Sequence, residues 1–261
     1  MKDHHRRAIE KAKDKLLDQQ EGLLAILLAG SLAKGTERAD SDVDLILVVQ
    51  DDEYRKRSAG NRVAEILRDC CDYEGGYVEA TYVGRSFVRE AAERGSEPTR
   101  NSFVGTTLIY CADPEIEAWL LLIPVYPEHD KQRKIESFYA QFHLNRSYFW
   151  KKGKETNDRY LQARAATEIV LYGCRLILAH NGILFPCHRE LVEQTLSAPK
   201  KPEDLQKSID RFLNDMTDEA KEEFCRGIEE LSAWAGADTV SRFVLDTEMS
   251  WYTGSPAVSD W

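Results

Sequence analysis

Two aspartates with one residue between them, Asp42 and Asp44, are the side chains in this sequence best suited to chemistry. They open an apolar run from Val43 to Val49, which has the length of a buried strand. Side chains two apart on a strand share a face, so we expect both carboxylates on one side of it. Such close like charges are costly without a cation between them, and magnesium prefers oxygen ligands and substrate phosphates. The pair therefore predicts a metal together with a phosphate-bearing substrate.

A glycine-bearing loop just before this strand has the residues of a phosphate site. Gly30 closes the apolar run from Leu23 to Ala29 and would let the backbone turn tightly against a ligand. Ser31 offers a hydroxyl and a backbone N–H to phosphate oxygens at the start of the next turn. Lys34 and Thr36, in the same loop, could add charge-assisted contacts to the β or γ phosphate.

The order of these features resembles the active-site signature of the DNA polymerase beta superfamily of nucleotidyltransferases. Gly30-Ser31 follows one strand, and Ser41-Asp42-x-Asp44 heads the next. The resemblance implies that both aspartates bind metal, two Mg²⁺ ions in all, and that Gly30, Ser31 and Ser41 contact the nucleotide. ATP or another nucleoside triphosphate would be the co-substrate.

Members of that superfamily usually carry a third carboxylate on a later strand, as a metal ligand or as the base toward the attacking hydroxyl. Glu79 is our candidate, because it is the one acid in the alternating segment from Tyr77 to Val83 and buried carboxylates are rare unless paired or metal-bound. The segment is similar to the Glu-x-Thr strand of aminoglycoside adenylyltransferases, in which the Glu is the catalytic base. An exposed edge-strand Glu is the alternative, and Asp72 and Glu74, in a turn before Gly75-Gly76, are weaker substitutes.

The pattern of elements indicates an α+β protein with a mixed sheet followed by a helical bundle. We predict a domain boundary near two prolines, with a nucleotidyltransferase domain at 1–126 and a helical acceptor-binding domain at 127–261. Helical spacing predicts helices at 5–20 and 60–71 in the first domain, and short apolar runs predict strands at 23–29, 43–49, 77–83 and 102–111. In the second domain the expected helices are 131–152, 157–180, 187–196, 202–214, 217–235 and 238–247.

This layout resembles the antibiotic adenylyltransferases, in which a helical domain closes over the nucleotide and holds the acceptor. The segment 181–186 with Arg189 is similar to an Asn-Gly, aromatic, Pro, basic segment of those proteins, which implies that Arg189 reaches the triphosphate. A surface Arg at a helix N-terminus is the alternative. The implied reaction is magnesium-dependent transfer of AMP to a hydroxyl of a small molecule, such as an aminoglycoside-like antibiotic, and hence a role in antibiotic resistance.

The composition limits the kinds of molecule that this protein is expected to bind. A formal net charge of −10 and a pI of about 5.2 argue against extended binding to nucleic acid, and favour a cationic acceptor. A basic stretch from Lys131 to Lys154 is interpreted as a solvated face. Six cysteines without metal-ligand spacing indicate buried reduced thiols, and a charged N-terminus and short apolar runs predict a cytoplasmic protein without membrane contact.

Three other functions stay open at this level. A protein adenylyltransferase of the toxin–antitoxin kind would use the same site on a different acceptor. A HEPN-like ribonuclease is suggested by the Arg-x4-His spacing from Arg175 to His180, although apolar Leu176 follows the Arg. A non-catalytic nucleotide-binding module is disfavoured, because the residues of the expected site are all intact.

Overall fold

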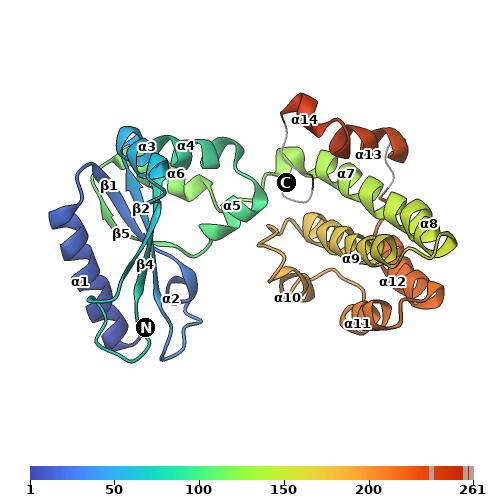
Figure 1. Cartoon of the computed structure of the whole chain (residues 1–261), viewed down its shortest axis with the longest axis horizontal. Helices are drawn as coiled ribbons and strands as arrows, with labels where there is room; N and C mark the ends of the chain where they lie inside the picture. The colour runs from blue at the N-terminus through green and yellow to red at the C-terminus, as the bar shows by residue number, and fades with distance from the viewer. Residues whose placement is uncertain (235–237, 255–257, 259–261) are drawn as a thin grey trace. The chain divides into compact units, whose positions relative to one another are not determined.

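The computed structural model describes residues 1–234, 238–254 and 258, and the chain divides into two compact units, Met1–Val125 and Tyr126–Trp261 (Figure 1). The first unit contains a five-stranded sheet, and the described part of the second is helical. The predicted α+β class, with a mixed sheet before a helical region, is confirmed.

The sheet of the first unit has the strand order β3-β4-β2-β1-β5. Strands β2 and β4 are parallel, and the other neighbouring pairs are antiparallel. The strands are β1 (Leu23–Leu28), β2 (Val43–Val49), β3 (Ala64–Leu67), β4 (Val78–Gly84) and β5 (Thr107–Cys111). The helices are α1 (Asp3–Gln19), α2 (Gly30–Lys34), α3 (Asp51–Ala59), α4 (Arg85–Arg94), α5 (Glu97–Ser102) and α6 (Pro114–Leu122).

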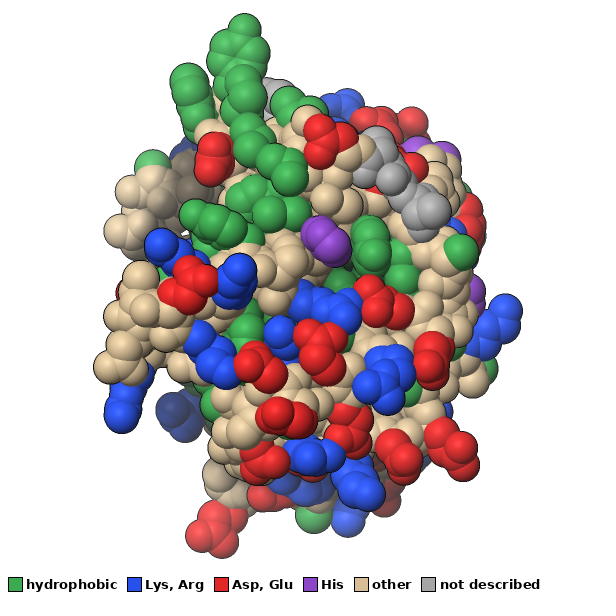
Figure 2. All heavy atoms as spheres, turned by 90° about the vertical axis from the view of Figure 1, so that its right-hand side faces the viewer, with side chains coloured by type: hydrophobic (Ala, Val, Ile, Leu, Met, Phe, Trp, Pro, Cys, Tyr) green, Lys and Arg blue, Asp and Glu red, His purple; other side chains and the backbone are tan. Residues whose placement is uncertain are grey.

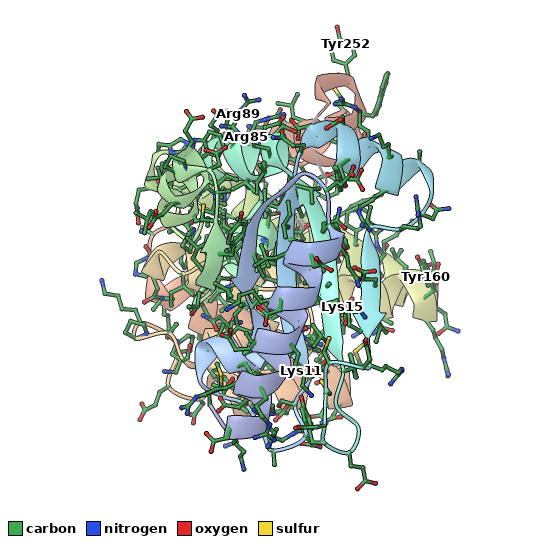
Figure 3. All side chains as sticks on the ribbon, turned by 90° about the vertical axis from the view of Figure 1, so that its left-hand side faces the viewer. Lys11, Lys15, Arg85, Arg89, Tyr160 and Tyr252 are labelled. Atoms are coloured by element: carbon green, nitrogen blue, oxygen red, sulfur yellow. The ribbon has the colours of Figure 1, made fainter. Side chains whose placement is uncertain are left out.

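Helices cover both faces of this sheet because the alternating strand residues are apolar on both. On one face, Ala8, Ala12 and Leu16 of α1 pack with the inward residues of β2 and β4. Figure 3 shows Lys11 and Lys15 on the side of α1 away from the sheet. On the other face, α4 and α6 pack against β1 and β2. The side chains of Asp42 and Asp44 belong to this second face, because Val43 and Leu45 point into the α1 side.

One prediction for this unit is wrong, and another is too long. Residues 60–71 contain no helix but an edge strand, β3, which buries only Leu67 and leaves Ile66 53% exposed. The chain turns at Asn61, whose φ is 52°, and the short apolar spacing fits a strand as well as a helix. The expected strand at 102–111 is also shorter, because α5 ends at Ser102 and β5 begins only at Thr107.

The second unit is built around one long buried helix, α9 (Arg159–Asn181), which ends at Gly182 in the left-handed conformation. Aromatic residues of its neighbours, including Phe138, Phe142 and Phe224, pack with it in a single core. The surrounding helices are α7 (Lys131–Leu144), α8 (Trp150–Glu155), α10 (Leu191–Leu196), α11 (Leu205–Asp215), α12 (Asp218–Leu231), α13 (Thr239–Thr247) and α14 (Ser250–Thr253), with a 3₁₀ turn η1 (Glu128–Asp130) before α7.

The predicted helix 131–152 is interrupted. Between α7 and α8 the chain forms a π-helical segment, η2 (Asn145–Phe149). Such segments leave a local bulge in a helix and are frequent at functional sites. In η2, Arg146 points to α12, where it pairs with Glu222 and Glu229.

The surface of the second unit mixes both charge signs. Figure 2 shows acidic and basic side chains interspersed on one face, with hydrophobic side chains gathered at its top. Within the basic stretch, Lys151 and Lys154 are exposed and pair with acidic neighbours, as expected of a solvated face. Lys134 is buried and Arg146 is only 22% exposed, so the interpretation does not hold for the whole stretch. All six cysteines are free thiols, of which Cys70, Cys174 and Cys225 are buried. No helix in the described part of the chain has the length and apolarity needed to cross a membrane.

Candidate active site

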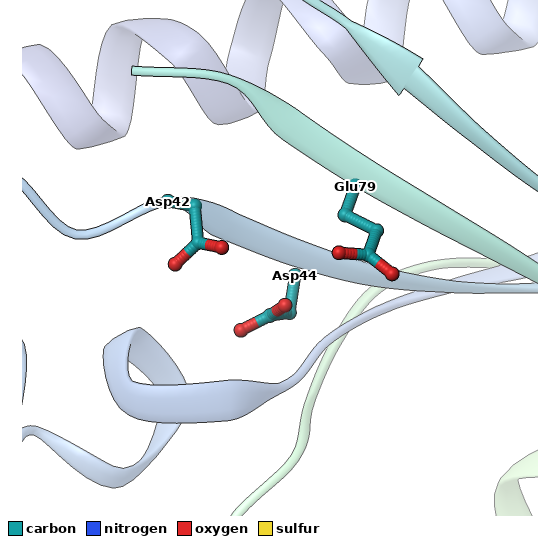
Figure 4. A group of neighbouring side chains, drawn as sticks. All are labelled: Asp42, Asp44 and Glu79. Atoms are coloured by element: carbon teal, nitrogen blue, oxygen red, sulfur yellow. The ribbon is translucent and has the colours of Figure 1, made fainter. Parts of the chain in front are cut away.

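Three carboxylates, Asp42, Asp44 and Glu79, converge on the face of the sheet covered by α4 and α6 (Figure 4). One oxygen from each lies within 4.8 Å of the others, and all three side chains are half-buried. Asp44 and Glu79 are direct partners in the parallel pairing of β2 with β4, while Asp42 immediately precedes β2. The strand ladder therefore sets the spacing of the three groups.

The electrostatics of this group favour a bound cation. Burial, and after it the charges of Asp42 and Glu79, raise the pKa of Asp44 above its usual range. Within the described ranges no Lys or Arg forms an ion pair with any of the three carboxylates. Clustered oxygens without a protein cation are suitable ligands for a divalent ion such as magnesium, so the donor set fits the predicted metal.

Gly30 lies directly against Asp44. Its φ is 65°, and a Cβ on this residue would lie 1.8 Å from Asp44 Oδ2, so any side chain here would collide with the carboxylate. The backbone is fixed beside it, because Ala29 N donates to Asp44 O at 2.9 Å. Glycine thus lets helix α2 begin in contact with the carboxylate group, where Ser31 follows as the next residue.

The other predicted nucleotide contacts lie along the segment that joins α2 to β2. Lys34 ends α2 and is exposed, with its stem beside Gly105, and Thr36 is exposed just after the helix. Ser41 is half-buried, and its Oγ accepts a hydrogen bond from Arg38 N at 2.9 Å, which shapes the loop before Asp42. Their contacts with a nucleotide stay predictions.

The remaining candidates lie elsewhere. Arg189 belongs to the second unit, where it is 85% exposed and pairs with Glu190. Asp72, the weaker substitute for Glu79, pairs with Arg7 at 2.9 Å, and neither it nor Glu74 is a member of the carboxylate group. The structure therefore supports Glu79 over both alternatives as the third carboxylate.

Two tyrosines near Asp42 were not predicted from the sequence. Tyr73 donates its hydroxyl to Ser41 O at 2.7 Å, and its ring packs against His4 and His5. The phenol of Tyr77 hydrogen-bonds the Asp42 carboxylate, and this contact raises the pKa of the phenol. No local pattern in the sequence marks either tyrosine, because each contact joins segments that lie far apart along the chain.

The ribonuclease alternative does not fit the position of Arg175. This side chain is fully buried, with its guanidinium 4.3 Å from the ring centre of Phe138 and 4.2 Å from that of Phe185. His180 packs edge-on against Trp234. An Arg held between two core rings is not presented to an RNA phosphate.

The three carboxylates form a group that could hold a metal ion. Residues 9–97 match a family model described as a nucleotidyltransferase domain, and this span contains all three carboxylates and Gly30. The chain thus carries a nucleotidyltransferase domain and is a nucleotidyltransferase enzyme.

Comparison with solved structures gives weaker likenesses. A nucleotidyltransferase-like protein from Exiguobacterium sibiricum is 11% identical with a TM-score of 0.48, over 96% of this chain and 79% of that one. A spectinomycin adenyltransferase, AAD(9), from Enterococcus faecialis with ATP and spectinomycin is 16% identical with a TM-score of 0.34, over 83% of this chain and 99% of that one. Likenesses at these scores define neither fold nor function. No curated protein matches the sequence.

Proposed function

We propose that this enzyme transfers AMP from magnesium-bound ATP to a hydroxyl group of a small, cationic molecule. The observation that carries the proposal is the convergence of Asp42, Asp44 and Glu79 within 4.8 Å in the domain matched by the nucleotidyltransferase model. Residues 127–261 are proposed as the acceptor-binding domain.

In the proposed reaction the three carboxylates divide two tasks. Asp42 and Asp44 hold the divalent ions, with Glu79 as a further ligand or as the base. When bound, magnesium would offset charge on the phosphate oxygens and orient the triphosphate. Gly30 and Ser31 present backbone N–H groups and a hydroxyl to those oxygens.

The transfer itself is a substitution at the α-phosphorus. The acceptor oxygen forms a bond to this phosphorus, the bond to pyrophosphate breaks, and Glu79 takes the proton of the acceptor hydroxyl. Positioning supplies most of the rate in such reactions, so the fixed register of Asp44 with Glu79 is the relevant feature of the protein.

The class of acceptor is supported by charge alone. A net charge of −10 attracts cationic molecules and repels nucleic acid. A polyamine-like antibiotic, such as an aminoglycoside or an aminocyclitol, combines positive charge with free hydroxyls. We therefore propose this class before a protein acceptor.

The test is transfer of label from α-labelled ATP, with magnesium, to a panel of aminoglycosides and aminocyclitols and, separately, to a cell lysate. We expect a labelled small molecule whose formation needs magnesium. Asp42→Asn and Asp44→Asn should abolish transfer, and Glu79→Gln should lower it about 10²- to 10⁴-fold if it is the base.

Asp72→Asn is the matched control, because this aspartate lies in the same unit but pairs with Arg7 outside the group. It should keep full activity. Label found only on lysate proteins would show a protein acceptor and overturn the small-molecule proposal. Unchanged transfer by Asp44→Asn would overturn the site itself.

A further inference from the structure

A second site lies wholly within the helical unit. A cavity of about 170 Å³ opens between η2, α9 and α13, and we call it the Glu168 pocket. Since one water occupies about 30 Å³ in the liquid, this space holds about five waters or one small organic group. The residues that matter for its chemistry are Gln141, Asn145, Phe149, Glu168, Tyr172 and Phe243.

Glu168 is an acid of this pocket that has no partner among the described residues. In the part of the chain that the structure describes it forms no hydrogen bond and no ion pair, although Arg164, which also lines the pocket, lies one turn before it on α9. Burial raises its pKa, and the positive charges of Arg164 and His188 only partly oppose this. The second acid of the pocket, Asp246, is already paired with Arg242 at 2.7 Å. Glu168 is therefore the group that a cation would satisfy.

The two amides of the pocket also present acceptors. Asn145 donates its Nδ2 to Gln141 O at 2.9 Å, and Gln141 donates its Nε2 to Thr247 Oγ1 at 3.0 Å. The Thr247 hydroxyl in turn donates to Phe243 O, which fixes the direction of the chain of bonds. Both amide nitrogens are thus engaged, and the amide oxygens remain as acceptors for a ligand donor.

Three aromatic rings also line the pocket. Phe149 comes from the π-helical segment and Phe243 from α13, with ring centres 5.6 Å apart, and Tyr172 comes from α9 one turn after Glu168. Aromatic faces attract ammonium groups and tolerate their alkyl substituents, but they offer no ligand atoms to a small inorganic ion.

We propose that the Glu168 pocket binds an organic ammonium group, with the carboxylate as counter-ion and the rings of Phe149, Tyr172 and Phe243 around its alkyl part. The π-helical segment has a direct part in this site, because it places both Asn145 and Phe149 on the lining. The site is independent of the carboxylate group in the first unit and of the transfer proposed for it.

The test uses three probes of nearly one shape and different charge: tert-butylammonium, tert-butanol and pivalate. Binding to the full chain is measured by saturation-transfer NMR and calorimetry. The ammonium should bind, and the alcohol and the carboxylate should bind at least about tenfold more weakly. Glu168→Gln should weaken the ammonium at least about tenfold, and Phe243→Leu about 2- to 30-fold.

Glu230→Gln is the matched control, because Glu230 is an exposed acid of α12 outside the pocket. It should leave binding unchanged. Thermal unfolding checks that each variant is folded, and Glu168→Gln should unfold at the same or a higher temperature since it removes a desolvated charge. Equal binding of alcohol and ammonium, ammonium binding that survives Glu168→Gln, or no ammonium binding by the wild type would each overturn the proposal.

Discussion

Asp44→Asn should stabilise the metal-free protein while destroying its site. The oxygens of Asp42, Asp44 and Glu79 lie within 4.8 Å of one another, at which each like-charge pair costs about 1 kcal/mol in a water-like dielectric and about 3.5 kcal/mol at an effective dielectric of 20. The lower figure applies here because the side chains are half-exposed and water screens them. Asparagine has nearly the shape of aspartate and removes two of the three pairs. We therefore expect a gain of about 1–2 kcal/mol, or several degrees in the melting temperature.

The assay is thermal unfolding of wild type and variant in EDTA and in magnesium. Wild type should be less stable than Asp44→Asn in EDTA. Magnesium should stabilise the wild type but not Asp44→Asn, because ligand binding to the folded state raises its stability. Asp72→Asn serves as control and should respond to magnesium like the wild type. A variant less stable than wild type in EDTA, or one stabilised equally by magnesium, would refute the reasoning.

Three further results are expected from the same geometry. Gly30→Ala should abolish activity and should lower stability more than Gly35→Ala does. Both glycines have a positive φ, but only at Gly30 would a Cβ collide with an atom, Asp44 Oδ2. Unfolding curves and transfer assays of the two variants test this. Tyr73→Phe removes the hydrogen bond to the carbonyl before Asp42 and should raise the magnesium concentration needed for half-maximal activity severalfold. In EDTA, the contribution of Asp44 to stability should be fully present below the ordinary pKa of 3.8 of its carboxyl and be lost as pH rises through its raised folded pKa. The difference in melting temperature between wild type and Asp44→Asn, followed over a pH series, should therefore shift in favour of Asp44→Asn as pH rises.

The carboxylate group could be predicted from the sequence because its geometry follows from local rules. Asp42 and Asp44 share a face through strand alternation, and a lone acid in an uncharged strand marked Glu79. Tyr73 and Tyr77 could not be found in this way. Their contacts with Ser41 and Asp42 join segments about thirty residues apart, and no local period records such a pairing.

The errors in the fold have a similar origin. Helix α3 buries no residue, so it has no apolar stripe to indicate it, whereas β3 has two adjacent apolar residues that also fit a helical period. The π-helical segment could not be predicted from the sequence either. Phe138, Phe142 and Trp150 lie on both sides of it, and their spacing is compatible with a single continuous helix.

Because Asp44 pairs with Glu79 across β2 and β4, the site depends on the number of residues in these strands as well as on their types. A one-residue shift in the pairing of β4 with β2 would exchange the two faces of β4. Glu79 would then point toward α1, and an alanine or valine would lie beside Asp44. The turn at Gly75 is open, because a Cβ added to this residue would meet no atom within 4 Å. It can therefore lose or gain a residue without changing the pairing of β4 with β2. A one-residue insertion or deletion in the turn at Gly75 should therefore be tolerated, whereas one inside β2 or β4 that shifts the pairing of Asp44 with Glu79 should destroy the site even where every acidic residue is retained.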